Sequence, residues 1–312
     1  MSGKIYGIGS YIPVHYLDNN DLSKMVETND TWIRERTGVI KRHVITDDTT
    51  VSMAAKAAKK ALEDGHIKAE ELDMIIVSTI SSNVILPSTA CEVQKLIGAV
   101  NATCFDLNAA CTGFLMAYNT AQGFLISGMC KTILIIGAES LSKLIDWTDR
   151  GTCILFGDGA GAAVIREEQD ALFHTIMHSD GSKGAALTCN SKHWQDTAFL
   201  EMDGQSVFKF AVRQVPICIQ ELLDKMEQKT EDIDYFILHQ ANSRIVDSVA
   251  KRLHAPIEKF PMNLEEYGNT SSASIPILLD EMYKEGKLVK GHKLILAGFG
   301  AGLTWGASYL EW

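Results

Sequence analysis

The stretch "EELDMIIVS", residues 70–78, returns 161 residues later as "EDIDYFILH", residues 231–239. At the same offset, "ILIIGA" from Ile133 matches "LILAGF" from Leu294, and "NAACTG" from Asn108 matches "NTSSAS" from Asn269. Three matches at one spacing indicate two copies of one structural unit. We expect these copies to be residues 1–165 and 166–312, packed about a pseudo-twofold axis around a shared cleft.

Short apolar runs alternate with helical patterns along the chain. The runs "DMIIVSTI" (73–80), "TILIIGAES" (132–140), "DYFILHQ" (234–240) and "KLILAGFG" (293–300) are typical of strands buried on both faces. Patterns such as "SMAAKAAKKALEDG" (52–65) between them are typical of amphipathic helices. This alternation predicts an α/β fold, with mainly parallel strands covered by helices.

One cysteine stands where a predicted strand, 102–107, gives way to a helix in "DLNAACTGFLMAYNTAQGF" (106–124). That helix is apolar on nearly every face, which indicates that it is buried, and Gly128 is a suitable C-cap. Cys111 would then lie at the positive end of a helix dipole, where a lowered thiol pKa is expected. The alternative is a packing role, because free cysteine is among the most buried residue types.

The repeat places two further polar residues near Cys111. Cys111 aligns with Ser272 of the second copy, and Ser78 aligns with His239, at the end of a central strand where α/β sheets bind ligands. Asn269 stands at the start of the second central helix. Alone, the histidine would be a satisfied core group and the asparagine a helix N-cap. Together, at matched positions of a duplication, they predict a shared site.

Composition excludes several classes of protein. The apolar segment 123–138 contains Lys131 and is too short to cross a membrane, and the first residues lack a signal-peptide pattern. Seven scattered cysteines without any CxxC predict neither a disulfide framework nor a metal site, and favour a cytoplasmic location. A net charge of −10 argues against nucleic acid as a partner.

Five motifs carry a resemblance to a known family: "TNDTWIRERTG" (28–38), "AACTGF" (109–114), "DRGTCILFGDGAGAAV" (149–164), "HQANSRI" (239–245) and "YGNTSSASIP" (267–276). From Ile5 to Ala307 the chain resembles the thiolase-fold condensing enzymes, and most closely the β-ketoacyl-acyl-carrier-protein synthase III family. The resemblance implies a five-layer αβαβα fold, with two duplicated halves and mixed sheets around two central buried helices.

The same resemblance implies an activity, the decarboxylative condensation of an acyl-CoA primer with malonyl-acyl carrier protein that initiates type II fatty acid synthesis. Cys111 would accept the acyl group, with His239 and Asn269 as its partners. Coenzyme A thioester would be a substrate, and no cofactor is implied. Alternatives are a related acyltransferase, a quinolone- or polyketide-type synthase, and a Cys-His-Asn thioester hydrolase. The apolar surroundings of Cys111 argue against the hydrolase, because a dry site protects a thioester from water.

The resemblance also implies substrate contacts. The residues that would bind coenzyme A are Thr28, Trp32, Arg36, Thr37, Arg150 and Asn242. Trp32 in a helical stretch and Arg150 in a loop would stack on the adenine. The backbone of Cys111 and Ala301 would form the oxyanion hole. Leu86, Met202 and Phe299 would line the acyl pocket. Relatives often have Phe at the position of Leu86, so a wider pocket is expected, and the loop 81–91 would cross a homodimer interface.

A basic face is expected on two predicted helices of this acidic protein. Arg244, Lys251 and Arg252 share one face of the helix after His239, and Lys209 and Arg213 lie one turn apart on another. Such a face is usually only solvated, but here it would suit an acidic acyl carrier protein. The expected carrier-binding residues are Lys209, Arg213, Gln240, Ala241, Asn242, Ser243, Arg244, Lys251 and Arg252.

Overall fold

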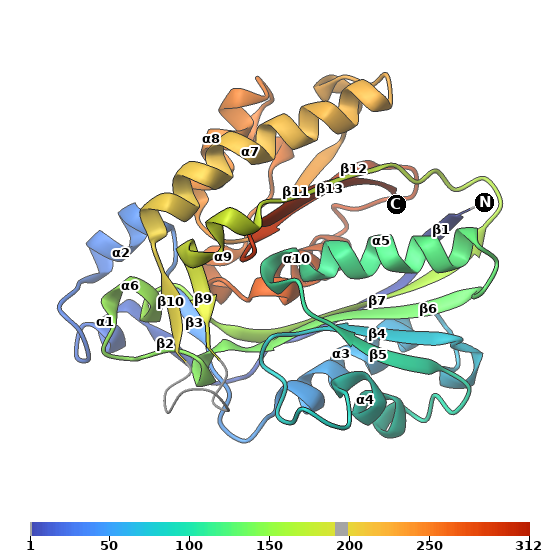
Figure 1. Cartoon of the computed structure of the whole chain (residues 1–312), viewed down its shortest axis with the longest axis horizontal. Helices are drawn as coiled ribbons and strands as arrows, with labels where there is room; N and C mark the ends of the chain where they lie inside the picture. The colour runs from blue at the N-terminus through green and yellow to red at the C-terminus, as the bar shows by residue number, and fades with distance from the viewer. Residues whose placement is uncertain (1, 191–198) are drawn as a thin grey trace.

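The computed structural model describes residues 2–190 and 199–312, which fold into five layers (Figure 1). Helices α3 (Thr50–Asp64) and α4 (Thr89–Ile97) cover the outer face of one sheet. Helices α7 (Gly204–Lys225) and α8 (Ser243–Arg252) cover the outer face of the other. Between the sheets lie α5 (Gly113–Ile126) and α10 (Ser274–Lys284). The expected αβαβα architecture is confirmed.

Both sheets are mixed. The strands of the first, in spatial order, are β1 (Ser2–Tyr11), β7 (Asp158–Glu168), β6 (Thr132–Ser140), β4 (Met74–Ser78) and β5 (Thr103–Leu107). Those of the second are β11 (Tyr235–Leu238), β12 (Lys293–Gly300), β13 (Thr304–Glu311) and β8 (Thr175–Ser179). Only the pairs β4–β5, β4–β6 and β11–β12 are parallel. The expectation of mainly parallel strands was wrong, because β12 returns directly into β13 through a short turn, which only an antiparallel partner allows.

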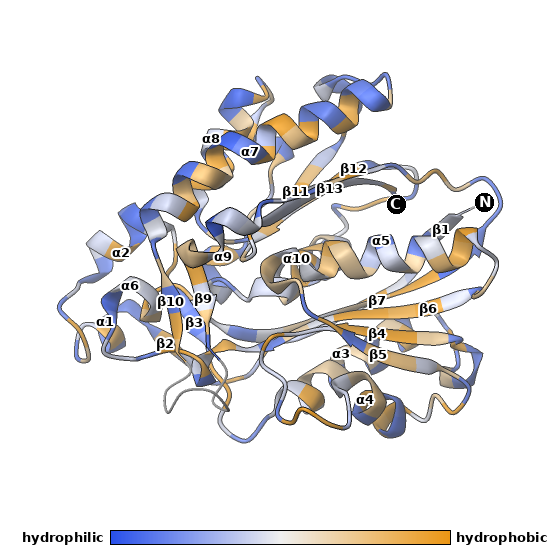
Figure 2. Ribbon diagram, in the orientation of Figure 1, coloured by the Kyte–Doolittle hydropathy of each residue, from blue (hydrophilic) through white to orange (hydrophobic). Residues whose placement is uncertain are grey.

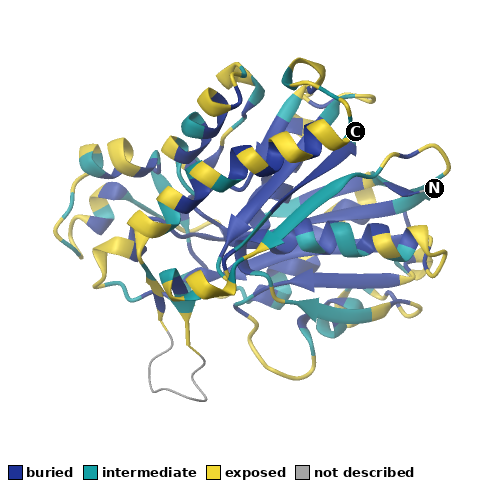
Figure 3. Ribbon diagram, turned by 45° about the horizontal axis from the view of Figure 1, so that its top comes forward, coloured by how far each residue is buried: buried dark blue, intermediate teal, exposed yellow. Residues whose placement is uncertain are grey.

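Continuous apolar sequence explains why the central strands and helices are buried. Every residue of β4 and β6 is buried, because helices cover both faces of the sheet (Figures 2 and 3). Phe114 and Tyr118 of α5 pack in one core cluster with Ile275 and Leu278 of α10. Most of α5 and α10 is therefore buried, and only their C-terminal turns reach the surface, which explains why α5 lacks a polar face.

The duplication extends to details of the backbone. The 3₁₀ turns η2 (Ala110–Thr112) and η7 (Ser271–Ala273) are 161 residues apart and precede the two central helices. Each contains a residue in the left-handed region, Ala110 with φ +46° and Ser271 with φ +51°. In the second half, α9 (Leu264–Tyr267) lies at the positions equivalent to residues 103–106, which form most of β5 in the first half. We propose to divide the halves after Glu168 rather than Ile165, because β7 belongs to the first sheet.

Small elements gather at one end of the layered body, on the left of Figure 1. They are β2 (Tyr16–Asp18), α1 (Asn19–Leu22), α2 (Asp30–Thr37), β3 (Lys41–His43), α6 (Arg150–Cys153), β9 (Leu187–Cys189) and β10 (Leu200–Met202). Leu22, Ile33 and Leu200 belong to a separate core cluster that holds them together. This end carries the motif 28–38 and the first part of the motif 149–164, which continues into β7 of the first sheet.

The two halves meet through backbone at matched glycines. A Cβ at Gly137 of β6 would lie 2.3 Å from the carbonyl oxygen of Ser272. At the equivalent position of β12, a Cβ at Gly298 would lie 3.3 Å from the Cα of Thr112. Each sheet therefore holds the turn of the opposite half at a distance that leaves little room for a side chain.

We predict that Gly137→Ala destabilises the fold, because the new methyl group would collide with backbone that cannot move independently. The expected loss is about 1–3 kcal/mol. Gly123→Ala is the matched control: no atom lies within 4 Å of its Cβ position, and alanine within a helix gains about 0.5–1 kcal/mol over glycine. Thermal unfolding followed by circular dichroism should show opposite shifts of Tm. Equal shifts would contradict the close approach of the halves.

Candidate active site

Cys111 lies in η2, two residues before α5 begins, and is 7% exposed. The turn between β12 and β13 lies against it: a Cβ at Gly300 would be 2.8 Å from the Cβ of Cys111. A glycine at this position therefore allows the turn to come close to the thiol. Ala301, which follows it, lines the same cavity as Cys111 and is not in the left-handed region.

The expected lowering of the thiol pKa was wrong. Burial raises the pKa of Cys111 to about 12; a hydrogen bond from the Ser271 hydroxyl opposes this rise, and the negative charge of Glu139 adds to it. The loss of water around an enclosed sulfur disfavours the thiolate. The resting nucleophile candidate is therefore a thiol, and its proton must be removed before it can attack.

His239 follows β11 directly and is 1% exposed. Its Nδ1 lies 2.7 Å from the Ser274 hydroxyl oxygen, which also accepts the Gln240 backbone N–H at 3.3 Å. The hydroxyl proton is then directed to Nδ1, and this network assigns the ring proton to Nε2. Burial lowers the pKa of His239 to about 3, so the ring is a neutral donor at physiological pH. Phe299 contacts the ring edge to face, with centroids 5.2 Å apart.

Asn269 is held by backbone on both sides. Its N–H donates to the Leu155 carbonyl at 2.8 Å, and its own carbonyl accepts the Gly157 N–H at 3.0 Å. The side-chain Oδ1 accepts the Ser271 N–H at 2.9 Å, so the amide oxygen is used within the protein. The Nδ2 group is the end of this side chain that can donate to a ligand.

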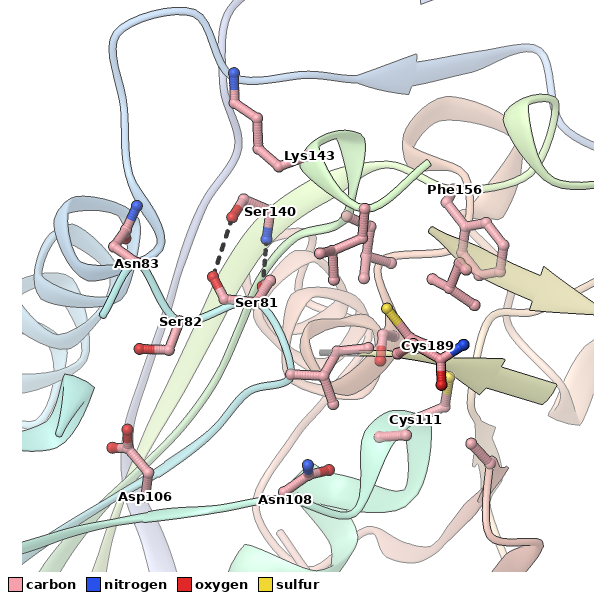
Figure 4. Close-up of a pocket in the computed structure, with 18 of the residues that line it drawn as sticks. Ser81, Ser82, Asn83, Asp106, Asn108, Cys111, Ser140, Lys143, Phe156 and Cys189 are labelled. Atoms are coloured by element: carbon pink, nitrogen blue, oxygen red, sulfur yellow. Dashed lines mark hydrogen bonds between the residues drawn. The ribbon is translucent and has the colours of Figure 1, made fainter. Parts of the chain in front are cut away.

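A cavity of about 1140 Å³ reaches Cys111 (Figure 4). Its walls are mainly apolar and come from both the layered body and the small elements, including Ile80, Leu141, Leu144, Phe156, Leu187 and Leu200. Leu86 lines the cavity as expected, but on a loop that leaves it 82% exposed. Cys189, which the sequence did not single out, lies in the same wall.

Two residues expected in the acyl pocket do not line this cavity. Met202 packs against the core cluster of the small elements, where β10 pairs with β9. Phe299 belongs to the core of the second half and supports His239 instead. Alternation along a strand explains Phe299, because its neighbour Gly300 is the residue of β12 that faces Cys111. In β10, Leu200 reaches the cavity, whereas Met202, on the same side of the strand, does not.

Comparison with known proteins identifies the family. A family model described as 3-oxoacyl-[acyl-carrier-protein (ACP)] synthase III matches residues 105–181, and the model of its C-terminal part matches residues 223–312. A β-ketoacyl-[acyl-carrier-protein] synthase III of Clostridium novyi is 50% identical to this chain, across 99% of it and 98% of the relative. The chain belongs to the β-ketoacyl-acyl-carrier-protein synthase III family.

Solved structures agree with this assignment. The 3-oxoacyl-[acyl-carrier-protein] synthase III of Aquifex aeolicus is 43% identical and superposes with a TM-score of 0.96, covering 99% of this chain and 100% of its own. The priming β-ketosynthase of the R1128 polyketide pathway is 33% identical, with a TM-score of 0.95 and coverage of 99% and 96%. The thiolase-like fold of the synthase III family is thereby confirmed for this chain.

Three of the expected coenzyme A contacts lie together at the end of the layered body. The guanidinium carbon of Arg150 lies 4.9 Å from the centroid of the Trp32 indole, and that of Arg36 lies 5.9 Å away. Trp32 and Arg36 are on α2, as expected. Arg150 begins α6, with Asp149 as N-cap, rather than lying in a loop. Two cations thus flank one aromatic ring.

The other expected contacts differ in their surroundings. Asn242 caps α8 through Oδ1, and its Nδ2 donates to the Arg36 carbonyl at 3.0 Å. Thr37 is buried, and its hydroxyl donates to Ile33 O at 2.7 Å, so it closes the end of α2. Thr28 Oγ1 is buried and has no hydrogen-bond partner among the described residues. Of these, Thr37 has a structural explanation that requires no ligand.

The expected carrier-binding residues are only partly exposed. Lys209 and Arg213 of α7, and Arg244, Lys251 and Arg252 of α8, are exposed on two helices that pack together. Arg244 lies over the ring of Phe208, 5.4 Å from its centroid. Gln240 was wrongly included, because it is 1% exposed and its Nε2 donates to Leu238 O. Ala241, Asn242 and Ser243 are half-buried.

Three polar residues of the site were missed by the sequence analysis. Ser271 and Ser274 lie within the quoted motif "YGNTSSASIP". The order of its residues does not show which hydroxyl lies near His239 and which lies near Cys111. Glu139 lies near the end of the apolar run 132–140, and a lone carboxylate at the end of a buried strand is a signal that could have been noticed.

No helix of the described residues has the length and apolar content to cross a membrane.

We predict that Ser274→Ala shifts part of the His239 ring proton from Nε2 to Nδ1, because Nδ1 loses the hydroxyl that donates to it. Nitrogen-15 NMR of the ring should show a larger Nδ1–H population. Decarboxylation of a malonyl thioester should fall by about 10- to 100-fold, while release of coenzyme A in the acylation step changes little. Ser127→Ala, at the exposed end of α5, is the control. An unchanged ring spectrum would refute the role of Ser274.

Proposed function

We propose that Cys111 carries the acyl group and that His239 and Asn269 stabilise the charge that develops during condensation. The reaction itself follows from family membership: the chain is an acyltransferase that condenses an acyl-CoA with malonyl-acyl carrier protein, the step that initiates fatty acid synthesis. The single observation that supports these roles is that one segment, residues 269–274, contains Asn269, hydrogen-bonds to His239 through Ser274 and lines the same cavity as Cys111 through Ser271.

In the first half-reaction, the Cys111 sulfur attacks the thioester carbonyl of the primer and coenzyme A leaves, so the scheme is ping-pong. The carbonyl oxygen becomes negative as the tetrahedral intermediate forms. The backbone N–H groups of Cys111 and Ala301 are proposed to donate to it, and the close approach at Gly300 supports this arrangement. Removing one such donor from an oxyanion hole typically costs about 100- to 1000-fold in rate.

In the second half-reaction, the malonyl thioester loses carbon dioxide, and its thioester oxygen acquires enolate character. Nε2–H of His239 and Nδ2–H of Asn269 are proposed to donate to this oxygen. Both groups are neutral, because burial lowers the pKa of His239 to about 3 and an amide does not ionise. The same neutral histidine does not favour the thioester hydrolase alternative, because it holds no charge to stabilise a resting thiolate.

Substrates are proposed to enter from the end that carries α2 and α6. The adenine of coenzyme A would insert between Trp32 and Arg150, which already contact each other as cation and ring. The exposed basic residues of α7 and α8 would then bind the acidic carrier protein on the neighbouring surface. The smaller Leu86 is proposed to admit longer or branched primers.

A homodimer and a cytoplasmic location are also proposed. Strand β5 is an edge of the first sheet, where an unpaired strand favours pairing with another chain. The nearby loop exposes Val84, Ile85 and Leu86, which a partner would cover. The cytoplasmic location rests on the scattered cysteines.

We predict that acetyl-CoA alone leaves an acetyl group on Cys111, detectable by mass spectrometry of the peptide. The adduct should persist in water, because the surrounding walls are apolar, and disappear after malonyl-acyl carrier protein is added. Cys111→Ala should show no adduct, and Cys153→Ala, at another buried cysteine, should behave as wild type. An adduct that hydrolyses without the second substrate would favour the hydrolase.

We predict that Arg244→Glu weakens binding of the acyl carrier protein, because the reversed charge repels an acidic partner. The KM for malonyl-acyl carrier protein should rise about tenfold, which corresponds to about 1.4 kcal/mol, while the KM for acetyl-CoA stays unchanged. Lys95→Glu, on α4 of the opposite outer layer, is the matched charge control. Equal losses for both substrates would contradict a docking role for this face.

A further inference from the structure

Glu139 is a buried carboxyl group for which the proposed mechanism has no use. It lies near the end of β6 and is 0% exposed. Within residues 2–190 and 199–312, no lysine, arginine or histidine forms an ion pair with it. A buried polar group is costly unless hydrogen bonds satisfy it, so the donors that surround Glu139 indicate what it does.

One carboxyl oxygen is held by the first half of the chain. Oε2 accepts hydrogen bonds from Ser81 Oγ at 2.7 Å, from the Ile80 N–H at 3.1 Å and from Thr79 Oγ1 at 3.3 Å. The Ser81 hydroxyl oxygen in turn accepts the Ser140 N–H at 2.8 Å (Figure 4). Because a backbone N–H can only donate, this end of the side chain is anchored as an acceptor.

The other carboxyl oxygen holds η7 of the second half. Oε1 accepts hydrogen bonds from Ser272 Oγ at 3.0 Å and from Ser271 Oγ at 3.3 Å. These two hydroxyls belong to consecutive residues of the turn that leads into α10. One side chain thus joins the end of a strand in the first sheet to a turn that follows Asn269.

This turn decides where the amide group of Asn269 points. The Ser271 N–H donates to Asn269 Oδ1 at 2.9 Å, which is the only hydrogen bond of that side chain among the described residues. The bonds to Leu155 and Gly157 fix the main chain of Asn269 but not the rotation of its side chain. The direction of Nδ2 therefore depends on the position of the Ser271 N–H.

Ser271 is held in a disfavoured backbone conformation. Its φ of +51° lies in the left-handed region, which is unfavourable for residues other than glycine. A residue keeps such a conformation only where its surroundings enforce it. The hydrogen bonds that Glu139 accepts from Ser271 and from its neighbour Ser272 are contacts of this kind.

The duplication shows that this contact serves only one of the two turns. The residue equivalent to Glu139, 161 positions later, is Gly300. Likewise, Ser272 of η7 is equivalent to Cys111 of η2. A Cβ at Gly300 would lie 2.8 Å from the Cβ of Cys111, so no side chain reaches that turn from the equivalent position. The carboxyl group is therefore particular to the turn beside Asn269.

We propose that Glu139 is a positioning residue for Asn269. It ties η7 to the first sheet, holds the Ser271 N–H in place and thereby directs Nδ2–H of Asn269 at the thioester oxygen of the malonyl substrate. The proposal rests on the role of Asn269 given above. Glu139 itself is not part of the cavity wall and does not touch the substrate.

Glutamine at this position should preserve the link. Its amide oxygen can accept the Ile80 N–H, and its NH₂ group can donate to the hydroxyl oxygens of Ser271 and Ser272. The Ser272 hydroxyl can then donate to the Ser78 carbonyl oxygen, which lies 3.1 Å away. Burial raises the pKa of Glu139 to about 7, and a protonated carboxyl group can bond in the same way. The link therefore depends on hydrogen bonds and does not require a charge.

The test compares the two half-reactions in the full-length protein. Glu139→Ala should slow decarboxylation of malonyl-acyl carrier protein about 10- to 100-fold, as is typical when a group that orients a reacting residue is lost. Release of coenzyme A during acylation and the KM for malonyl-acyl carrier protein should change little. Glu139→Gln should lose at most about threefold, because it keeps the link. A loss in Glu139→Gln as large as in Glu139→Ala overturns the proposal, since the carboxyl group would then act through its charge or its proton.

Two further variants control for the loss of a buried group. Asp158→Ala removes another buried carboxyl group of the first sheet, which is bonded to Ser142 and to the Ile45 N–H. It should leave the ratio of the two half-reaction rates unchanged, and a change equal to that in Glu139→Ala overturns the proposal. Ser271→Ala combined with Ser272→Ala removes both hydroxyls that reach Oε1. It should reproduce the loss, and it provides the same test if Glu139→Ala does not fold.

Asn269→Ala separates this proposal from the proposed mechanism. Alone, it should slow decarboxylation about 100- to 1000-fold, the effect of removing one donor to a developing negative charge. Adding Glu139→Ala to it should cause no further loss, because Glu139 acts through the Asn269 amide. An equal loss with and without Asn269 overturns the positioning role. Normal decarboxylation in Asn269→Ala overturns the role of Asn269 itself, whatever the Glu139 variants do.

Discussion

The site depends on how closely two turns of backbone approach the sheets of opposite halves. A sheet covered on both faces can accept another segment at such a distance only where it has no side chain. Gly137 and Gly298 provide that space on β6 and β12, and η7 and η2 lie against them. The turns carry Ser271 and Cys111 into one enclosed volume. With side chains in place of these glycines, the two turns could not approach the sheets, and the residues of the site would lie farther apart.

The two copies have diverged at matched positions. At one pair of positions, the size of one residue limits the size of the other. In the second copy His239 follows a strand and Ser274 begins the central helix; in the first, the equivalent residues are Ser78 and Gly113. A Cβ at Gly113 would lie 1.8 Å from the Ser78 hydroxyl oxygen, so the first copy has no room for the larger pair. One copy could thus present a thiol because the other supplied the imidazole with its hydroxyl.

Exclusion of water decides the charges in this site. The same burial keeps the thiol protonated, the imidazole neutral and Glu139 close to its titration point at neutral pH. These are three consequences of one cause, since a low-dielectric region penalises whichever form is charged. Apolar walls near Cys111 protect an acyl thioester from water. The burial of the sulfur also disfavours the thiolate.

The amino-acid sequence determined the duplication, the α/β layers and the candidates Cys111, His239 and Asn269. Repeated spacing and buried strand patterns depend only on the order of residues along the chain, so they can be recognised without a structure. It did not determine which hydroxyls meet these groups, or the pKa of the thiol. Ser274 reaches His239, and Glu139 reaches Ser271, across 35 and 132 residues of chain. Such contacts, and the loss of water that sets each pKa, exist only after the two halves have packed together.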